Sequence, residues 1–189
     1  MRKINKLLFL VLGLMILPGT MLYAASSQSE VSVYVNNVVQ KQSGILSEGE
    51  AFIPAEQLSE NLYGLLSVEE SGNTVRIYKP NVNTTLLDDK GGIFGKVKSP
   101  ARITFSTLVQ VDNLKTEISD IKITITDPAD KTEVIDTQQI NNKEENFWFK
   151  SVEFTYNFNT KGSYAILVYF KDINSGKWFP VSEIRIFGI

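Results

Sequence analysis

The sequence contains no histidine and no cysteine among its 189 residues. Without them the usual zinc and copper ligand sets are unavailable, and no Ser–His or Cys–His catalytic pair can form. Disulfides are excluded too, so the fold must be held by hydrophobic burial. We therefore expect no metal and no cofactor. Catalysis would have to depend on carboxylates, and we expect that the protein is not an enzyme.

A strong positive charge is also lacking. The chain carries 19 Lys and Arg against 21 Asp and Glu, and its formal net charge is −2. Nonspecific nucleic-acid binding depends on Lys and Arg displacing counterions from phosphates. Because no basic block stands out along the sequence, we expect no nucleic-acid partner.

Residues 1–25 have the pattern of a secretory signal peptide. Three of the first six residues are Arg or Lys, residues 7–17 are an apolar run broken by one Gly, and a Pro-Gly pair ends the run before Ala24 and Ala25. This pattern predicts export, with cleavage after Ala24 or Ala25. The alternative is an uncleaved anchor, because residues 7–25 are close to the roughly 20 residues that span a bilayer. Contact with a membrane is expected only in that case.

Composition divides the remaining chain into two units. Residues 31–79 contain short strands and one helical stretch, whereas residues 93–189 have β patterning throughout. Between them, residues 80–92 gather Pro, Asn, Asp and paired Gly, which are typical of turns and linkers. The sequence thus predicts a small α+β module with an antiparallel sheet and one short helix, a linker, and an all-β domain.

In the first unit, Val31, Val33 and Val35 alternate with polar or exposed positions, as in a strand with one buried face. Asn36 and Asn37 tolerate the left-handed conformation and predict a turn after this strand. A second strand is expected over residues 51–53.

After that strand, Pro54 fits the first position of a helix. The spacing of Leu58, Leu62 and Leu65 predicts an apolar stripe that packs on the sheet. A hairpin should follow, with its turn at residues 71–73.

The segments "VYVNN" (33–37), "AFIPAEQLSENL" (51–62) and "LSVEESGNTVRIYK" (66–79) together resemble the copper amine oxidase N-terminal-like domain. This module is common in exported proteins of Gram-positive bacteria. The sequence departs from the family pattern, since Asn37 replaces a Gly, and no Trp occurs in residues 67–70. The resemblance implies a noncatalytic accessory module, because the copper and cofactor sites of the enzyme lie in other domains.

The second unit offers seven strand segments with intervening turns at residues 127–130, 159–163 and 173–177, as an antiparallel sandwich requires. The segments are residues 93–97, 101–111, 120–127, 132–138, 150–158, 163–170 and 177–187. Gly162, Tyr164 and Ile166 are similar to the tyrosine-corner pattern of immunoglobulin-like domains, in which the Tyr hydroxyl bonds back to the backbone. The resemblance implies an immunoglobulin-like β-sandwich over residues 93–189.

Aromatic residues are the candidate binding surface. They are Phe147, Trp148, Phe149, Trp178 and Phe179. If residues 147–149 are extended, at least one ring must face away from the core. In the predicted strand order, the second pair lies on a neighbouring edge. Exposed rings can stack on sugars or anchor a protein partner, and packing within the protein is the alternative.

Carboxylates and a loop cation were also considered. The candidate acids are Glu48, Glu50, Glu56, Asp88, Asp89, Glu144, Glu145 and Glu153. A glycoside hydrolase needs two facing carboxyls about 5 to 10 Å apart, but these acids fall mainly in turns, where solvated charge is the simpler interpretation. Asp172 and Asn174 lie in an incomplete calcium-loop pattern, and a hairpin turn is favoured there.

These observations favour a secreted or cell-envelope-associated, noncatalytic protein that binds a cell-wall polymer or an extracellular protein. An inhibitor or accessory subunit of an exported enzyme is the alternative, and a carboxylate glycan hydrolase is the third hypothesis.

Overall fold

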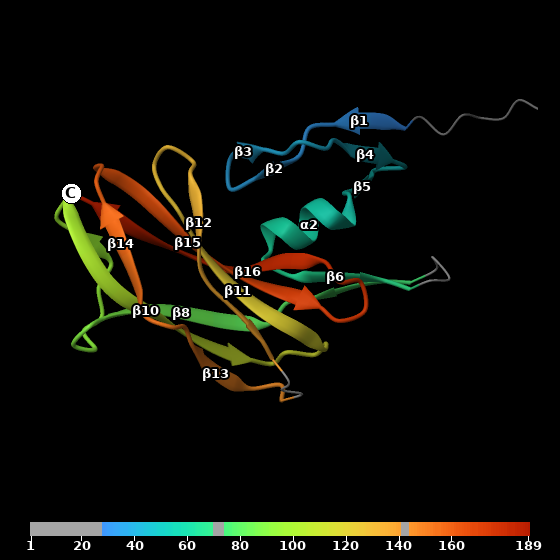
Figure 1. Ribbon diagram of the computed structural model, residues 1–189. Coiled ribbons are helices and arrows are strands. Elements are labelled where there is room, and N and C mark those ends of the chain that lie inside the picture. Colours follow the sequence, from blue (N-terminus) through green and yellow to red (C-terminus); the bar gives the residue numbers. More distant parts are fainter. Residues whose placement is uncertain (1–27, 70–73, 141–143) are drawn as a thin grey trace, which may run out of the picture.

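The computed structural model describes residues 28–69, 74–140 and 144–189 (Figure 1). The expected signal peptide and the hairpin turn at residues 71–73 lie outside the described residues. The described chain is β-rich, with several sheets and one short helix. None of its helices is long and apolar enough to cross a membrane.

The N-terminal region, residues 28–79, consists of short elements. They are β1 (Ser29–Val31), β2 (Tyr34–Val35), β3 (Val38–Val39), β4 (Gly44–Ser47), β5 (Glu50–Phe52), α2 (Ala55–Asn61), β6 (Leu65–Val68) and β7 (Val75–Tyr78). The strands form a β1-β4-β5 sheet and the two hairpins β2-β3 and β6-β7. Asn36 and Asn37 have φ angles of 49° and 64°, so the turn expected between β2 and β3 is confirmed.

The C-terminal region, residues 81–189, contains the long strands. They are β8 (Asn81–Asp88), β9 (Lys96–Val97), β10 (Ala101–Asp112), β11 (Ile118–Thr126), β12 (Thr132–Gln139), β13 (Phe147–Lys150), β14 (Phe154–Phe158), β15 (Gly162–Asp172) and β16 (Trp178–Gly188). One sheet joins β8, β13 and β14 to β10, and the other has the order β12-β11-β15-β16-β9.

Alternating side chains from both sheets form one core. In β15, Tyr164, Ile166, Val168 and Phe170 are at most 1% exposed, while the residues between them are half-buried. Side chains of β10 join the same apolar cluster. Burial of large apolar side chains contributes roughly 1.5–3 kcal/mol each, so this core is the main source of stability.

The tyrosine corner is present. The Tyr164 hydroxyl donates to the Thr160 carbonyl over 2.8 Å and accepts from the Thr160 N–H over 3.2 Å. Tyr164 is 1% exposed and Ile166 is fully buried. The predicted hydrogen bond from the hydroxyl to the backbone is therefore confirmed.

Residues 80–92 differ from the linker that their composition predicts. Residues 81–88 form β8, which pairs with β10 over its whole length. Thr84 and Leu86 face the other sheet, and the Thr84 hydroxyl bonds that of Ser182 over 2.9 Å. Asn81 and Asn83 point outward, whereas Thr84 points inward, as in a strand. The prediction of a linker is therefore wrong for residues 81–88. Only Lys79 and buried Pro80 separate β7 from β8.

The helix also differs from expectation. Pro54 is the N-cap residue and not the first helical residue. Leu62 is 45% exposed, whereas Gln57 and Ser59 are buried, and Leu65 belongs to β6. The expected apolar stripe is therefore wrong, because one helical face buries polar side chains: Gln57 bonds the backbone of Gln42, and the Ser59 hydroxyl donates to the Glu56 carbonyl within the helix.

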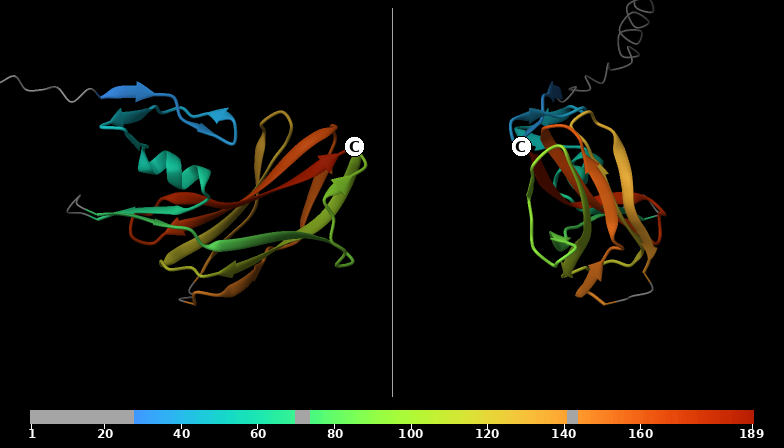
Figure 2. Two further views of the ribbon diagram at one scale, coloured as in Figure 1. Left: turned by 180° about the vertical axis from the view of Figure 1, so that it is seen from behind. Right: turned by 60° about the vertical axis from the view of Figure 1, so that its left-hand side comes forward.

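The N-terminal region lies over one side of the five-stranded sheet. In Figure 1 and in the reversed view of Figure 2, α2 lies between the β1-β4-β5 sheet and β16. Leu65 and Leu66 of β6 extend the main apolar cluster. The two regions are therefore in direct contact.

Candidate functional site

The candidate aromatic residues of β13 divide between the two faces of their sheet. Phe149 is 8% exposed and Phe147 is half-buried against the core, whereas Trp148 is 64% exposed. β13 pairs with β10, with Trp148 opposite Gln110. The alternation of side chains in a strand explains this division, and it leaves Trp148 as the ring that faces solvent.

The second aromatic pair is less accessible. Phe179 is 8% exposed. The Lys122 ammonium lies 4.4 Å and that of Lys171 5.8 Å from the centre of the half-buried Trp178 ring. Cations over an indole are attracted by its electron-rich face, so Trp178 already has partners within the chain. The Trp178 side chain borders a groove of about 490 Å³ that Glu56 and Leu66 also line.

The two aromatic segments do not form one edge. β13 belongs to the sheet of β10, while β16 lies between β15 and β9 in the other sheet. Figure 1 shows β13 on the side of the molecule away from α2, whereas β16 passes close to α2. The structure thus corrects the expected adjacency, because strand neighbours here are set by pairings distant in sequence.

A cleft of about 790 Å³, here called the junction cleft, opens between the β2-β3 hairpin, α2 and Arg185 of β16. Its lining mixes Val38 and Val39, both more than half exposed, with charged and amide side chains. Concave surfaces of this size are common ligand sites. Residues 35–63 supply most of its walls, and Arg185 closes it from a strand more than 100 residues further along the chain.

Side-chain amides hold the walls of the junction cleft together. The Gln57 carboxamide accepts from the Gln42 N–H over 2.9 Å and donates to the Gln42 carbonyl over 3.2 Å. Asn61 donates to the Gln40 side chain over 2.8 Å. Gln57 thereby pairs with the backbone as a neighbouring strand would, and it fixes the hairpin segment to α2.

Tyr63 connects the N-terminal region to β16. Its hydroxyl donates to a Glu183 carboxylate oxygen over 2.7 Å, and the other Glu183 oxygen accepts from Arg185 over 2.7 Å. Burial, followed by the hydrogen bond to Glu183, raises the pKa of Tyr63 to about 12. The phenol is therefore neutral and remains a donor at physiological pH.

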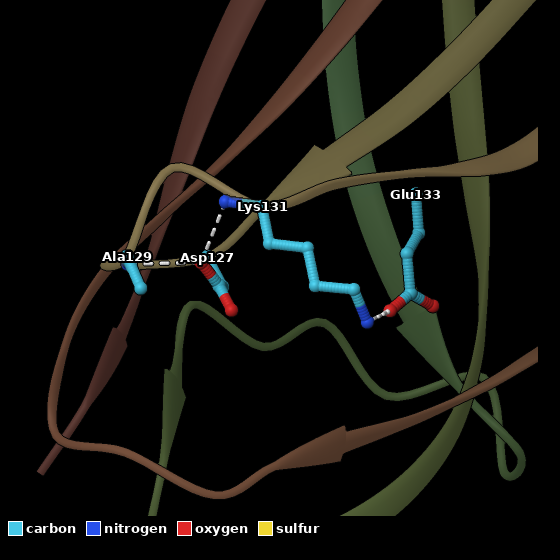
Figure 3. Close-up of polar contacts among 4 residues, drawn as sticks. All are labelled: Asp127, Ala129, Lys131 and Glu133. Carbon is cyan, nitrogen blue, oxygen red and sulfur yellow. Dashed lines mark hydrogen bonds and ion pairs between the residues drawn. The ribbon is translucent and has the colours of Figure 1, made fainter.

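At the opposite end of the β-rich region, the β11-β12 turn is closed by Asp127. Figure 3 shows its carboxylate accepting from the N–H groups of Ala129 and Lys131, over 2.8 and 2.9 Å, beside the Lys131–Glu133 ion pair. Burial, with smaller effects of Glu133 and Asp127, raises the pKa of nearby Tyr156 to about 12. These contacts account for the turn without a ligand.

The candidate carboxylates are dispersed. Only Asp88 is half-buried, and the other candidates are exposed. Asp88 accepts from the backbone N–H groups of Lys90 and Gly92, and Glu145 forms an ion pair with Lys115. Their positions extend from the β4-β5 turn to the segment before β14. Asp88 thus stabilises a turn, and Glu145 forms an ion pair at the surface.

The loop considered for calcium is a hairpin turn between β15 and β16. Asp172 is 2% exposed, and its carboxylate accepts from the Ser175 N–H over 2.7 Å. Within the described ranges, no group of three or more acidic side chains is arranged to hold a metal ion. The preference for a turn at this position is confirmed.

Comparison with known proteins gives no family: no protein-family model matches the chain, and no curated protein matches it.

The sequence patterns described above do not predict two features of these surfaces. The junction cleft depends on Gln57 and Asn61, whose spacing of four on a helix places them on one face and could have indicated a polar contact surface. The outward-facing surface of the sheet next to Trp148 includes β8, where composition alone predicts a linker. Its alternating Asn81, Val82, Asn83 and Thr84 carried the signal of a strand.

Proposed function

We propose that this chain is an exported, noncatalytic binding protein of the bacterial cell envelope. The main support for this proposal is Trp148, whose large ring is 64% exposed on the surface of a sheet. An exposed aromatic ring can stack on a sugar or anchor a protein partner. The partner is a cell-wall polymer or an extracellular protein, and the signal-like residues 1–25 provide the export route.

The architecture proposed for the C-terminal region is an immunoglobulin-like sandwich. The Tyr164 corner supports it, as does the strand order β12-β11-β15-β16, which matches a variable-type sheet with an additional strand. Ile166 occupies the core position where antibody domains have a Cys, and β11 has no buried Trp. The proposed domain is therefore a variant without the disulfide.

For the N-terminal region we propose a copper amine oxidase N-terminal-like module without copper. The support is the order of its elements, a β2-β3 hairpin, a strand that ends before Pro54, α2 and a second hairpin. This region spaces or docks the β-rich region.

A second candidate function is that of an accessory subunit or inhibitor of an exported enzyme. It is favoured by the exposed apolar side chains of the N-terminal region, among them Tyr34 at 65%, Val38 at 62% and Phe52 at 55%. This role predicts a stoichiometric complex in the culture medium.

Cell fractionation with crosslinking and mass spectrometry tests the proposal. The protein should occur in the medium or wall fraction, crosslinked to wall polymer or to an exported protein, and N-terminal sequencing should show cleavage after Ala24 or Ala25. Recovery in the cytoplasm with an intact N-terminus would contradict export, and turnover of wall glycans by the purified chain would contradict a noncatalytic role.

A further inference from the structure

The sheet face that carries Trp148 has a chemical pattern of its own. Across β8, β10 and β13, the register places Asn83 opposite Gln110 and Gln110 opposite Trp148. Gln110 and Trp148 point away from the core, because their strand neighbours Val109, Val111 and Phe149 are at most 8% exposed, and Asn83 is exposed on β8 between half-buried neighbours. We call Asn83, Gln110 and Trp148 the outer row.

The outer row combines one flat ring with neutral hydrogen-bonding groups. Gln110 donates one N–H to Asp112 over 3.0 Å, and a carboxamide has a second N–H and an acceptor oxygen beyond that bond. Asn83 is exposed and offers a second carboxamide. Neighbouring strands lie about 4.8 Å apart, so the row extends over the length of two linked pyranose rings.

The two tryptophans differ in their availability. Lys122 and Lys171 already lie over Trp178. Within the described part of the chain, Trp148 makes no such contact with a cation or another ring, and Lys150 lies on the same strand face. The charges on this face do not add up to one sign, because Asp112 is negative and Lys150 is positive. This pattern favours a ligand with many hydroxyls and little charge.

We propose that the outer row binds a neutral pyranose glycan. The Trp148 indole stacks on the C–H face of one sugar ring, since an aromatic face carries partial negative charge. Gln110 and Asn83 exchange hydrogen bonds with the hydroxyls or amides of that ring and the next. The inference rests on the proposed envelope-binding role and names its ligand class.

Binding is tested on the full chain with three probes: a chitin oligosaccharide, a cello-oligosaccharide and poly(glycerol phosphate). Trp178→Phe leaves Trp148 as the single tryptophan, so its fluorescence reports contact directly. A neutral oligosaccharide should change the emission and bind. Binding of the polyanion alone, or of none of the probes, overturns the proposal.

The variants locate the site. Trp148→Ala should weaken binding about tenfold or more, because stacking is lost, whereas Trp148→Tyr should retain most of it. Asn83→Ala and Gln110→Ala should each weaken it about three- to tenfold. Tyr34→Ala removes an aromatic side chain of nearly equal exposure, 65% against 64%, and should leave binding unchanged. Equal affinity of wild type and Trp148→Ala overturns the assignment to this row.

Light scattering adds a separate readout. Concentration-dependent dimers that Trp148→Ala abolishes would show that this face joins two copies of the chain, and would overturn the glycan proposal. Cell fractionation distinguishes failure of the glycan proposal from failure of the proposed envelope role. A wall-associated chain without sugar binding retains the envelope role and loses the glycan, whereas a cytoplasmic chain contradicts the envelope role whatever the sugar result.

Discussion

The N-terminal and C-terminal regions are stabilised by different interactions. Buried apolar side chains of residues 81–189 form most of the core. Among the described residues, the N-terminal region adds the buried Leu65 and Leu66, with the partly buried Ala55, Ile77 and Tyr78 packed against it. Among the residues that the structure describes, ten of the seventeen exposed large apolar side chains lie in the N-terminal region. That region instead relies on the Gln57 amide and on contact with β16. A short module can thus adopt a defined fold by polar pairing when a larger domain supports it.

The largest expected effect is in the C-terminal core. Phe158 is fully buried, and its ring centre lies 5.0 Å from those of Tyr156 and Tyr164. Phe158→Ala should lower the free energy of unfolding by about 3–5 kcal/mol, as measured by urea denaturation. Leu62→Ala in the N-terminal region, where the side chain is 45% exposed, should cost less than about 1 kcal/mol. Comparable losses would remove the contrast between the regions.

A polar substitution should have its effect in the other region. Gln57→Leu leaves the Gln42 N–H and carbonyl without their partner, which should cost about 1–3 kcal/mol. Hydrogen exchange should increase across residues 40–61 and stay unchanged in β11 and β15. The isosteric control Gln57→Glu keeps an acceptor for the N–H and should have a smaller effect. Loss of protection throughout the chain would mean that the module is not stabilised separately.

The tyrosine corner provides a polar contact inside the apolar core. Tyr164→Phe keeps the ring but removes the bonds to Thr160, so calorimetry should show a loss of about 1 kcal/mol. Tyr34→Phe, at a side chain that is 65% exposed, is the matched control and should leave the melting temperature unchanged. An unaltered melting temperature for Tyr164→Phe would show that the corner bond adds nothing to stability.

The smallest effect concerns the contact between the regions at high pH. The pKa of Tyr63 is raised from its ordinary value of 10.0 to about 12, so the neutral phenol is favoured in the folded chain. Its contribution to stability is complete below pH 10 and is lost as the pH rises toward 12. Between pH 10 and pH 12, the free energy of unfolding of the Tyr63→Phe variant should therefore fall less than that of the wild type.

Denaturation at a series of pH values measures this difference. Tyr156→Phe is the control, since the pKa of Tyr156 is also raised to about 12 but its side chain lies in the other region. Parallel stability profiles for wild type and Tyr63→Phe would contradict the role of the Glu183 hydrogen bond.

Local patterns predicted much of the β-rich region. Five of the seven expected segments coincide closely with β10, β11, β12, β15 and β16, because alternation and turn residues act over short distances. The segment expected over residues 150–158 contains β14, but it also includes the end of β13 and three residues outside any strand. The seventh, residues 93–97, yields only the two-residue β9. The Tyr164 bond was likewise local, since it spans four residues.

The wrong predictions concern residues whose contacts come from segments that are distant in the sequence. The Leu58 and Leu62 spacing suggested a buried stripe, but the surface facing α2 offers backbone groups of residue 42, which select Gln57. The separation of Trp148 from Trp178 follows from sheet pairings between residues 36 to 42 positions apart, which no local pattern specifies. The candidate rings were found from composition, but their relative placement was not.

The short connection of Lys79 and Pro80 has a consequence for how the molecule moves in solution. Proline fixes its own φ angle near −65°, and Pro80 is buried directly before β8. With Tyr63 bonded to Glu183 on the other side, the regions cannot reorient independently without breaking contacts. NMR relaxation should therefore give a single rotational correlation time for amides of α2 and of β15.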